Sequence, residues 1–313
     1  DALPILTGVV SLSLPSYNAF RPDLYSFKNG NLMESFLALW QHLPSHISPV
    51  LFSIGSFQLR YYSLMYLVAF AVVYALFACR IKRGEIAFTT EGMQDYMVWA
   101  MLGLMIGGRL GYALFYNFSY YLSHPLEIFL PFDFSNGVRF VGLSGMSYHG
   151  GLIGVLLVTI YFCRRRNIFW WRFGDWLCAA APLGYLFGRI GNFLNGELWG
   201  RATTVPWGMF FPQDATGSLR HPSQLYEALF EGLFLFMVLW GVRKRNPFDG
   251  FMVGLYIFGY GLVRFVIEFF REPDAHLGFV LGFNTMGQVL CILMMLAGIA
   301  IILWRRRVSA ATK

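Results

Sequence analysis

Seven apolar runs, each close to 20 residues long, constrain this chain more than any other feature of its sequence. They cover residues 61–79, 92–116, 146–163, 174–194, 223–242, 249–270 and 285–304. A helix of about 20 apolar residues spans the hydrocarbon core of a bilayer, which is roughly 30 Å thick. Only 13% of the 313 residues are charged, against about 25% in an ordinary soluble domain. We therefore predict an all-α, polytopic integral membrane protein with seven transmembrane helices.

Four basic clusters predict the direction of these spans. They follow the first, third, fifth and seventh runs and consist of Arg80, Lys82 and Arg83, then residues 164–166, 243–245 and 305–307. Basic residues beside membrane spans concentrate on the cytoplasmic side, so the N-terminus is expected outside and the C-terminus in the cytoplasm. Since these clusters hold much of the basic excess behind the net charge of +7, the charge indicates topology and no nucleic-acid partner is expected.

The remaining segments suggest how the chain is organised. We expect an N-terminal extension of unknown role at residues 1–45, a transmembrane domain at 46–306 and a cytoplasmic tail at 307–313. Two outer connections, about 117–145 and 195–222, are rich in Pro, Gly and aromatic residues and are expected to be ordered. The four cysteines fall in or beside apolar runs without CxxC or Cys/His spacing, so we expect no disulfide, metal or other cofactor.

Three arginines lie inside the spans that run from the inner to the outer face. Arg109, Arg189 and Arg264 occupy the second, fourth and sixth runs, at about 25, 22 and 22 Å from the inner ends. A charged side chain within a bilayer costs at least ~2.5 to 3.5 kcal/mol on insertion scales, so such residues usually have a function or a partner. Separate snorkelling of each side chain to the outer headgroups is the alternative, and it stays open above all for Arg109.

Two motifs surround the other two arginines with polar residues. In "YGLVRFVIE", Tyr260, Arg264 and Glu268 are four residues apart and share one helix stripe, although an Arg264–Glu268 ion pair could be purely structural. In "GRIGNFLNGELWGR", Arg189 and Asn192 share a face, and the glycines allow a backbone or a lipid headgroup to come close. Because a guanidinium matches a phosphate, lipid phosphates of the outer leaflet are candidate ligands.

Other polar residues of the spans are harder to interpret. His149, in "MSYHGGLIG", opens the third run at its outer end and is either a catalytic group or an ordinary hydrogen-bonding side chain. Tyr62, at the outer end of the first run, fits an interfacial aromatic belt equally well. Glu227 and Glu231, four residues apart in the fifth run, are expected to face inward, and the sequence assigns them no role.

Four motifs together resemble bacterial prolipoprotein diacylglyceryl transferases: "MSYHGGLIG", "GRIGNFLNGELWGR", "HPSQLYE" and "GYGLVRFVIEFFR". The resemblance covers about residues 46–306. It implies a seven-helix enzyme of the bacterial inner membrane whose site opens to the periplasm and the outer leaflet. Such an enzyme moves the diacylglyceryl group of phosphatidylglycerol onto the lipobox cysteine thiol of a prolipoprotein signal peptide. A thioether forms and glycerol phosphate leaves, which is the first step of lipoprotein maturation.

The resemblance also implies site residues. The catalytic candidates are His149, Arg189 and Arg264, and the substrate-binding candidates are Arg189, Tyr62, Asn192, Glu197, Gly200, Tyr260 and Glu268. The leaving phosphate requires cationic donors. The attacking thiol, with an ordinary pKa near ~8.5, requires a base or a positive field. His149 would be the base, or the arginines alone would stabilise the thiolate, and both mechanisms stay open.

Two other functional classes are alternatives. A transporter or flippase for an anionic solute or lipid would use the arginines as a binding site. Transporters, however, usually bind near the midplane between inverted repeats, whereas "GRLG" and "GRIG" are a short repeat in spans of the same direction. A noncatalytic assembly subunit would leave the shared depth of the arginines unexplained.

Overall fold

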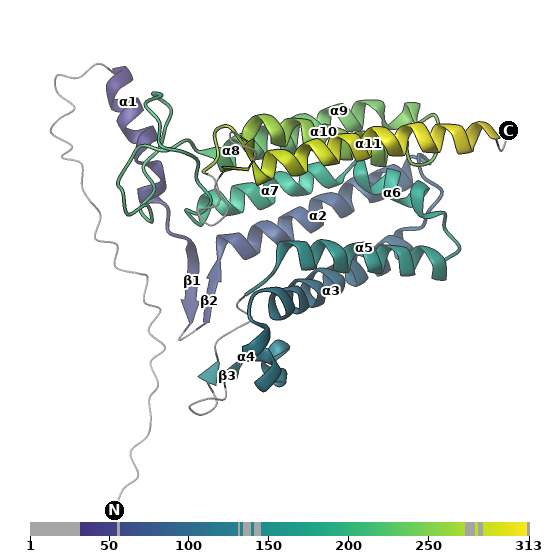
Figure 1. The fold of residues 1–313 in the computed structure, drawn as a ribbon, viewed down its shortest axis with the longest axis horizontal. Coiled ribbons are helices and arrows are strands. Elements are labelled where there is room, and N and C mark those ends of the chain that lie inside the picture. Colours follow the sequence, from purple (N-terminus) through teal and green to yellow (C-terminus); the bar gives the residue numbers. More distant parts are fainter. Residues whose placement is uncertain are drawn as a thin grey trace, which may run out of the picture. The chain divides into compact units, whose positions relative to one another are not determined.

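A computed structural model of the chain describes residues 32–54, 57–130, 132–133, 139–140, 145–272, 279–280 and 284–311 (Figure 1). The helices are α1 (Leu32–Gln41), η2 (Leu43–His46), α2 (Tyr61–Lys82), α3 (Thr90–Phe115), α4 (Phe118–Ser123), η3 (Pro125–Ile128), α5 (Tyr148–Arg165), α6 (Trp170–Cys178), α7 (Ala181–Leu194), α8 (Ser223–Glu227), η4 (Ala228–Phe234), α9 (Leu235–Val242), η5 (Arg243–Arg245), α10 (Phe251–Ile267) and α11 (Met286–Ala311). The described strands form three antiparallel hairpins: β1 (Val50–Ile54) with β2 (Phe57–Arg60), β3 (Phe132–Asp133) with β4 (Arg139–Phe140), and β5 (Phe279–Val280) with β6 (Asn284–Thr285).

Helices occupy every predicted apolar run. Within the described residues, four helical stretches are long and apolar enough to cross a membrane: Tyr61–Lys82, Thr90–Phe115, Ser223–Arg245 and Met286–Ala311. The apolar helix α10 is shorter, with 17 residues. The predicted helical membrane character is therefore supported, whereas the number of seven spans and their direction stay predictions.

The fourth predicted run is not one helix. Residues 174–194 are divided between α6 and α7, and Ala179 and Ala180 form a turn between them. Pro182 lies in the first turn of α7, where its missing N–H costs nothing, but inside a continuous helix it would remove a hydrogen bond and clash with the preceding turn. The prediction of a single helix over residues 174–194 was wrong, because the hydropathy of a run does not register the helix break that a proline causes.

The fifth predicted run contains an unusual wide turn. Between α8 and α9, residues Ala228–Phe234 form the π-helix η4. Gly232 of η4 lies directly against α7. A Cβ built on it would be only 2.7 Å from the Cβ of Leu186. π-Helical turns are rare and often occur at functional sites, and this one contains Glu231 and directly follows Glu227.

The chain divides into two compact units. The first comprises Asp1–Val73, Ala179–Arg243 and Gly254–Trp304, and the second comprises Tyr74–Cys178, Lys244–Val253 and Arg305–Lys313. We describe each unit by itself.

Glycines hold two helices of the second unit together. The helices α3 and α5 run side by side (Figure 1). A Cβ built on Gly107 would lie 2.4 Å from the backbone oxygen of Gly150, and one on Gly154 would lie 2.1 Å from that of Gly103. Small residues let membrane helices approach to backbone contact, where dispersion replaces the hydrophobic effect as the attraction.

In the first unit, the end of the predicted N-terminal extension packs on the connection at 195–222. Trp40 of α1 donates its indole N–H to the backbone oxygen of Trp207 at 3.0 Å. The adjacent core consists of Phe193, Met209 and Phe211, all of which are buried. Residues 1–31 of the predicted extension lie outside the described part of the chain.

Candidate functional site

Three arginines and three glutamates of the first unit lie together in what we call the arginine–glutamate cluster: Arg189, Arg264, Arg271, Glu227, Glu231 and Glu268. They come from α7, α8, η4, the end of α10 and the residues that follow it. The side chains of Glu227 and Glu231 are fully buried, and the arginine side chains are 13–18% exposed. Ionised carboxylates are almost never fully buried unless they are paired, and here three positive and three negative formal charges balance.

Glu227 is the centre of the cluster. One of its carboxylate oxygens lies 2.7 Å from Nε of Arg189, and the other lies 3.1 Å from Nη1 of Arg264 and 3.6 Å from Nη1 of Arg271. The sequence alone assigns no role to Glu227 or Glu231. The signal that points to them is a pair of carboxylates in an apolar run, because such residues usually face a partner inside the protein.

Arg264 connects Glu227 to two further carboxylates. Its guanidinium lies 3.1 Å from Glu268, in the ion pair that the sequence left open as an alternative, and 3.5 Å from Glu231. Glu268 also accepts a 3.1 Å hydrogen bond from the hydroxyl of Thr285, the residue that precedes α11. The positive end of this helix favours a negative charge at that position. Arg264 thus serves more than an ion pair within its own helix.

Arg189 is held by its own helix and by the segment that follows. Its Nε lies 2.7 Å from the hydroxyl of Tyr185, and its Nη1 donates to the side-chain oxygen of Asn192 at 3.3 Å. Asn192 in turn donates to Glu197 at 2.8 Å, and the Tyr185 hydroxyl donates to Glu231. Hydrogen bonds therefore connect Tyr185, Arg189, Asn192 and Glu197. They hold the Arg189 guanidinium at Nε and at Nη1.

The two predicted tyrosines, Tyr62 and Tyr260, border this network, and two glycines of α7 show what lies beside that helix. A Cβ on Gly191 would lie 3.2 Å from the Tyr62 ring, so Tyr62 packs directly on α7. The Tyr260 ring is 5.8 Å from the ring of Tyr185 in an edge-on arrangement. A Cβ on Gly188, next to Arg189 in the sequence, would meet no heavy atom within 4 Å. Open space therefore adjoins α7 at Gly188, about 100° around the helix from Arg189.

Gly200, expected to bind substrate, makes backbone contacts with the segment that carries Arg271. It forms an isolated β-bridge with Arg271, and its N–H donates to the backbone oxygen of His221 at 2.8 Å. A Cβ at this position would lie 2.2 Å from the backbone oxygen of Phe270, well inside van der Waals contact. The absence of a side chain at Gly200 therefore lets the 195–222 connection lie directly on Phe270 and Arg271.

His149 belongs to the second unit, in the first turn of α5. The helix begins after Ser147, whose hydroxyl accepts the N–H of Gly150 at 3.2 Å, the standard arrangement of an N-cap. The His149 side chain is exposed, and its ring lies 5.7 Å from that of Tyr148.

Arg109, also in the second unit, binds the backbone that follows its own helix. Nε donates to the backbone oxygen of Ile128 at 2.6 Å, and Nη2 donates to that of Glu127 at 2.6 Å. Nη1 donates to the backbone oxygen of Gly145 at 3.2 Å, and the guanidinium lies over the Tyr121 ring. Because Arg109 is buried in these contacts, the snorkelling alternative is wrong for this residue.

Comparison with known proteins identifies the family. The family described as prolipoprotein diacylglyceryl transferase matches residues 49–304, which include the whole arginine–glutamate cluster and His149. The chain belongs to the prolipoprotein diacylglyceryl transferase family. This membership places the chain among transferase enzymes and does not favour the transporter alternative.

Three relatives named phosphatidylglycerol–prolipoprotein diacylglyceryl transferase show how far the similarity extends. The protein from Chlorobaculum tepidum is 52% identical over 276 residues, which cover 88% of this chain and 96% of the relative. The protein from Geobacter sulfurreducens is 45% identical over 266 residues, covering 84% and 98%. The one from Campylobacter curvus is 44% identical over 265 residues, covering 84% and 96%. The similarity to this transferase family therefore spans nearly the whole length of each relative.

Proposed function

We propose that this protein transfers the diacylglyceryl group of phosphatidylglycerol to the lipobox cysteine thiol of a prolipoprotein. The observation that carries the proposal is the arginine–glutamate cluster, in a membrane chain that belongs to this transferase family. Partly buried arginines that lie together suit a lipid phosphate, which a guanidinium binds through two parallel hydrogen bonds.

In this proposal the cluster also stabilises the leaving group. Glu227 contacts both Arg189 and Arg264 in this structure. In the proposed reaction an incoming phosphate, which is also negatively charged, replaces this carboxylate as the partner of the two arginines. When the bond between carbon and the phosphate oxygen breaks, glycerol phosphate gains a second negative charge. Preorganised cationic donors are worth more at that moment than in the ground state, and this difference lowers the barrier.

In the proposed reaction the substrate sulfur forms a bond to the terminal glyceryl carbon as the bond between that carbon and the phosphate oxygen breaks. The electron pair of the broken bond leaves with glycerol phosphate, and the thiol proton passes to a base or to water. His149 is the candidate base, and the arginines are the alternative source of thiolate stabilisation. Asn192 and Glu197 position Arg189 through the hydrogen bonds described above.

The remaining assignments concern the surroundings of the site. We propose that Tyr62, Tyr260 and Glu268 border the bound lipid, that the chain is a multi-pass protein of the bacterial inner membrane, and that its site opens to the periplasm. The partners are then phosphatidylglycerol and the lipobox signal peptide. Reporter fusions after Lys313 and near Gln213 are expected on opposite sides of the membrane, and the same side for both would contradict the seven-span topology.

The decisive experiment combines the purified chain, labelled phosphatidylglycerol and a lipobox peptide. We expect a thioether-linked diacylglyceryl peptide and one glycerol phosphate per turnover, and no product from a control peptide with Ser in place of its cysteine. Movement of labelled lipid across vesicles without peptide modification would support the flippase alternative instead. Neither product nor movement, with protein that remains folded, would support a noncatalytic subunit.

The role of His149 needs a separate measurement. His149→Gln removes proton transfer, which is typically worth 10² to 10⁴-fold in rate. If His149 is the base, rising pH should restore part of the single-turnover rate, because hydroxide then supplies the thiolate. A ratio of variant to wild-type rate that stays constant with pH, at saturating lipid, would assign thiolate stabilisation to Arg189 and Arg264.

A further inference from the structure

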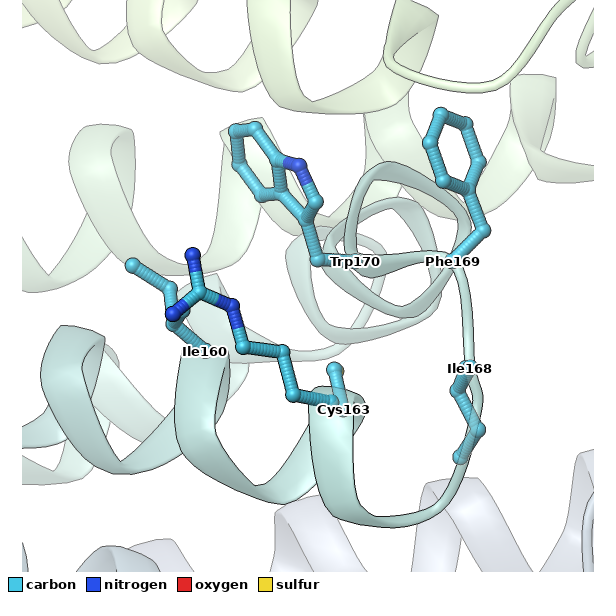
Figure 2. Close-up of a pocket in the computed structure, with 6 residues that line it drawn as sticks. Ile160, Cys163, Ile168, Phe169 and Trp170 are labelled. Carbon is cyan, nitrogen blue, oxygen red and sulfur yellow. The ribbon is translucent and has the colours of Figure 1, made fainter.

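A cavity of about 280 Å³ lies at the turn between α5 and α6, within the second unit. It is lined by Ile160, Cys163, Arg164, Ile168, Phe169 and Trp170 (Figure 2). Neither the transfer reaction nor the arginine–glutamate cluster uses any of these residues. The lining combines one cation with aliphatic and aromatic walls, which is the chemical character of a lipid-headgroup site at a membrane surface.

The turn that forms this cavity is tightly built. Asn167 has a left-handed backbone with φ of 53°, and the N–H of Ile168 donates to the backbone oxygen of Cys163 at 2.8 Å. This is the hydrogen-bond pattern that commonly closes an α-helix. It sends the chain directly back, so that Phe169 and Trp170 border the same cavity as the last turn of α5. The cavity is therefore fixed by backbone hydrogen bonds.

Arg164 and Arg165 differ from the basic residues that follow them, and of the two only Arg164 lines the cavity. Arg166 is paired with Asp95, and Arg172 makes an ion pair with Asp249 at 2.9 Å. Arg164 is exposed, and none of the carboxylates in the described residues lies within ion-pair distance of it. The cavity therefore has an uncompensated positive charge at its edge, which attracts an anion from the membrane surface.

An apolar stripe of α5 leads to this charge. Leu152, Leu156, Ile160 and Arg164 are each four residues apart, so they follow one another along one helix face. The three aliphatic side chains are 37–53% exposed. A cavity of about 280 Å³ is slightly smaller than typical sites for drug-sized ligands, which begin at roughly 300 Å³. It has room for a headgroup, while an acyl chain would lie along the stripe.

We propose that this turn binds one anionic phospholipid, with its phosphate at Arg164 and an acyl chain along Leu152, Leu156 and Ile160. The site shares no residue with the proposed transfer reaction, because its lining includes neither His149 nor any member of the arginine–glutamate cluster. Basic pockets at the ends of membrane helices are known to bind anionic headgroups. The bound lipid would tie the α5–α6 turn to the membrane surface.

The test counts and titrates bound lipid on the detergent-purified full chain by native mass spectrometry. The probe is dioleoyl phosphatidylserine, which is anionic but is not the proposed donor, and phosphatidylcholine is the zwitterionic reference. Arg164→Gln is expected to weaken the binding of one phosphatidylserine about fivefold. Arg165→Gln is the matched control, because it removes the same charge from the adjacent exposed residue, which does not line the cavity.

Further variants make the result decisive. Ile168→Glu places a carboxylate at the cavity wall and is expected to weaken the same lipid, whereas Arg189→Gln is expected to leave it bound. Equal weakening by Arg164→Gln and Arg165→Gln, or equal affinity for phosphatidylcholine, would overturn the proposal by reducing it to a general surface charge. Loss of this lipid in Arg189→Gln would also overturn it, because the lipid would then occupy the donor site. The experiment measures lipid binding and no transfer, so its result is independent of the proposed transfer activity.

Discussion

Arg109 and Arg189 occupy matching "GRLG" and "GRIG" motifs in apolar helices, yet their surroundings differ in kind. Three backbone oxygens accept the hydrogen bonds of Arg109 at 2.6 to 3.2 Å. Arg189 instead lies 2.7 Å from the carboxylate of Glu227 and 2.7 Å from the hydroxyl of Tyr185. The same residue in the same motif thus contacts backbone oxygens in one unit, and a carboxylate and a hydroxyl in the other.

The partners of the two arginines indicate different uses of their hydrogen-bond donors. The backbone oxygens around Arg109 cannot leave without unfolding the segment around η3, so its donors are committed to holding that segment. Arg189 and Arg264 instead contact a carboxylate, and the proposed function has a lipid phosphate, which a guanidinium also binds, take the place of that carboxylate. Under the proposed function, the chemistry of the partner therefore distinguishes a structural arginine from a substrate-binding one.

Replacement of the three arginines tests this distinction directly and should have the largest effect on the transfer rate. Arg189→Ala and Arg264→Ala should each lower the transfer rate by about 10² to 10³-fold or more, since each removes a preorganised donor to the leaving phosphate. Arg109→Ala should cost less than either. The measurement is the initial rate at equal amounts of folded protein, and an equal loss in Arg109→Ala would end the distinction.

Removing a carboxylate partner should destabilise the two regions unequally. Glu227→Gln leaves three partly buried guanidiniums short of one buried counter-charge, a change that typically costs about 3 to 5 kcal/mol. Glu127→Gln is the matched control, because Arg109 uses the backbone oxygen of Glu127 while the carboxylate accepts a 2.6 Å hydrogen bond from Tyr120. That loss should be about 1 kcal/mol.

Thermal unfolding in neutral detergent measures both variants. Added phosphatidylglycerol should raise the melting temperature of Glu227→Gln more than that of wild type, because the lipid phosphate restores the missing negative charge. Equal stability of the two variants, or no extra effect of the lipid, would contradict the exchange of carboxylate for phosphate.

A smaller effect is expected at Gly200. Gly200→Ala introduces a Cβ that would lie 2.2 Å from the backbone oxygen of Phe270, so the segment with Arg271 must move. Displacement of a binding group by about 1 Å can cost up to 10²-fold in rate. Gly241→Ala is the control, since a Cβ there meets no atom within 4 Å, and this variant should keep its activity. Unchanged transfer by Gly200→Ala would show that Arg271 needs no such support.

The smallest effect concerns acid and the 195–222 connection. Burial lowers the pKa of His221, and hydrogen bonds from Arg220 hold the pKa of Asp214 well below its usual range. For both groups the unfolded state binds protons more readily. Their stabilisation is complete above the ordinary pKa values of about 6.5 for His and 3.9 for Asp. It declines as pH falls below each of these values.

Limited proteolysis between neutral and acid pH measures this change. Cleavage within 195–222 should increase first below the ordinary His value and again below the Asp value, and Asp214→Asn should weaken only the second increase. The segment that Arg109 holds, Phe118–Leu130, is the internal reference. Parallel acid sensitivity of both segments would assign the effect to global unfolding.

Much of this architecture is predictable from the sequence because hydropathy is a property of single segments. The apolar runs located the helices, and residue spacing placed Arg264 and Glu268 close enough for the ion pair now found at 3.1 Å. The hydropathy of the fourth run does not distinguish Pro182 from other apolar residues. The missing N–H and the ring of this proline nevertheless predict the helix break that the structure contains.

The contacts within the arginine–glutamate cluster could not be predicted from the sequence, for a different physical reason. Periodicity states which residues share a face of one helix, but not which neighbouring helix that face contacts. Glu227 meets arginines from α7, from α10 and from the segment after it, so its importance appears only in three dimensions. For the same reason, the motif around Gly200 did not reveal that this residue is in contact with backbone.

The glycine contact between α3 and α5 has a consequence for how variation in this chain is interpreted. At Gly103, Gly107, Gly150 and Gly154, even one added methyl group would lie within 3 Å of the opposite helix. In a saturation mutagenesis survey these positions should reject substitutions as strictly as Arg189 does, although they carry no chemistry. Intolerance to change will therefore mark two populations of residues here, and only a readout of protein abundance beside activity will tell a site of close helix contact from a site of catalysis.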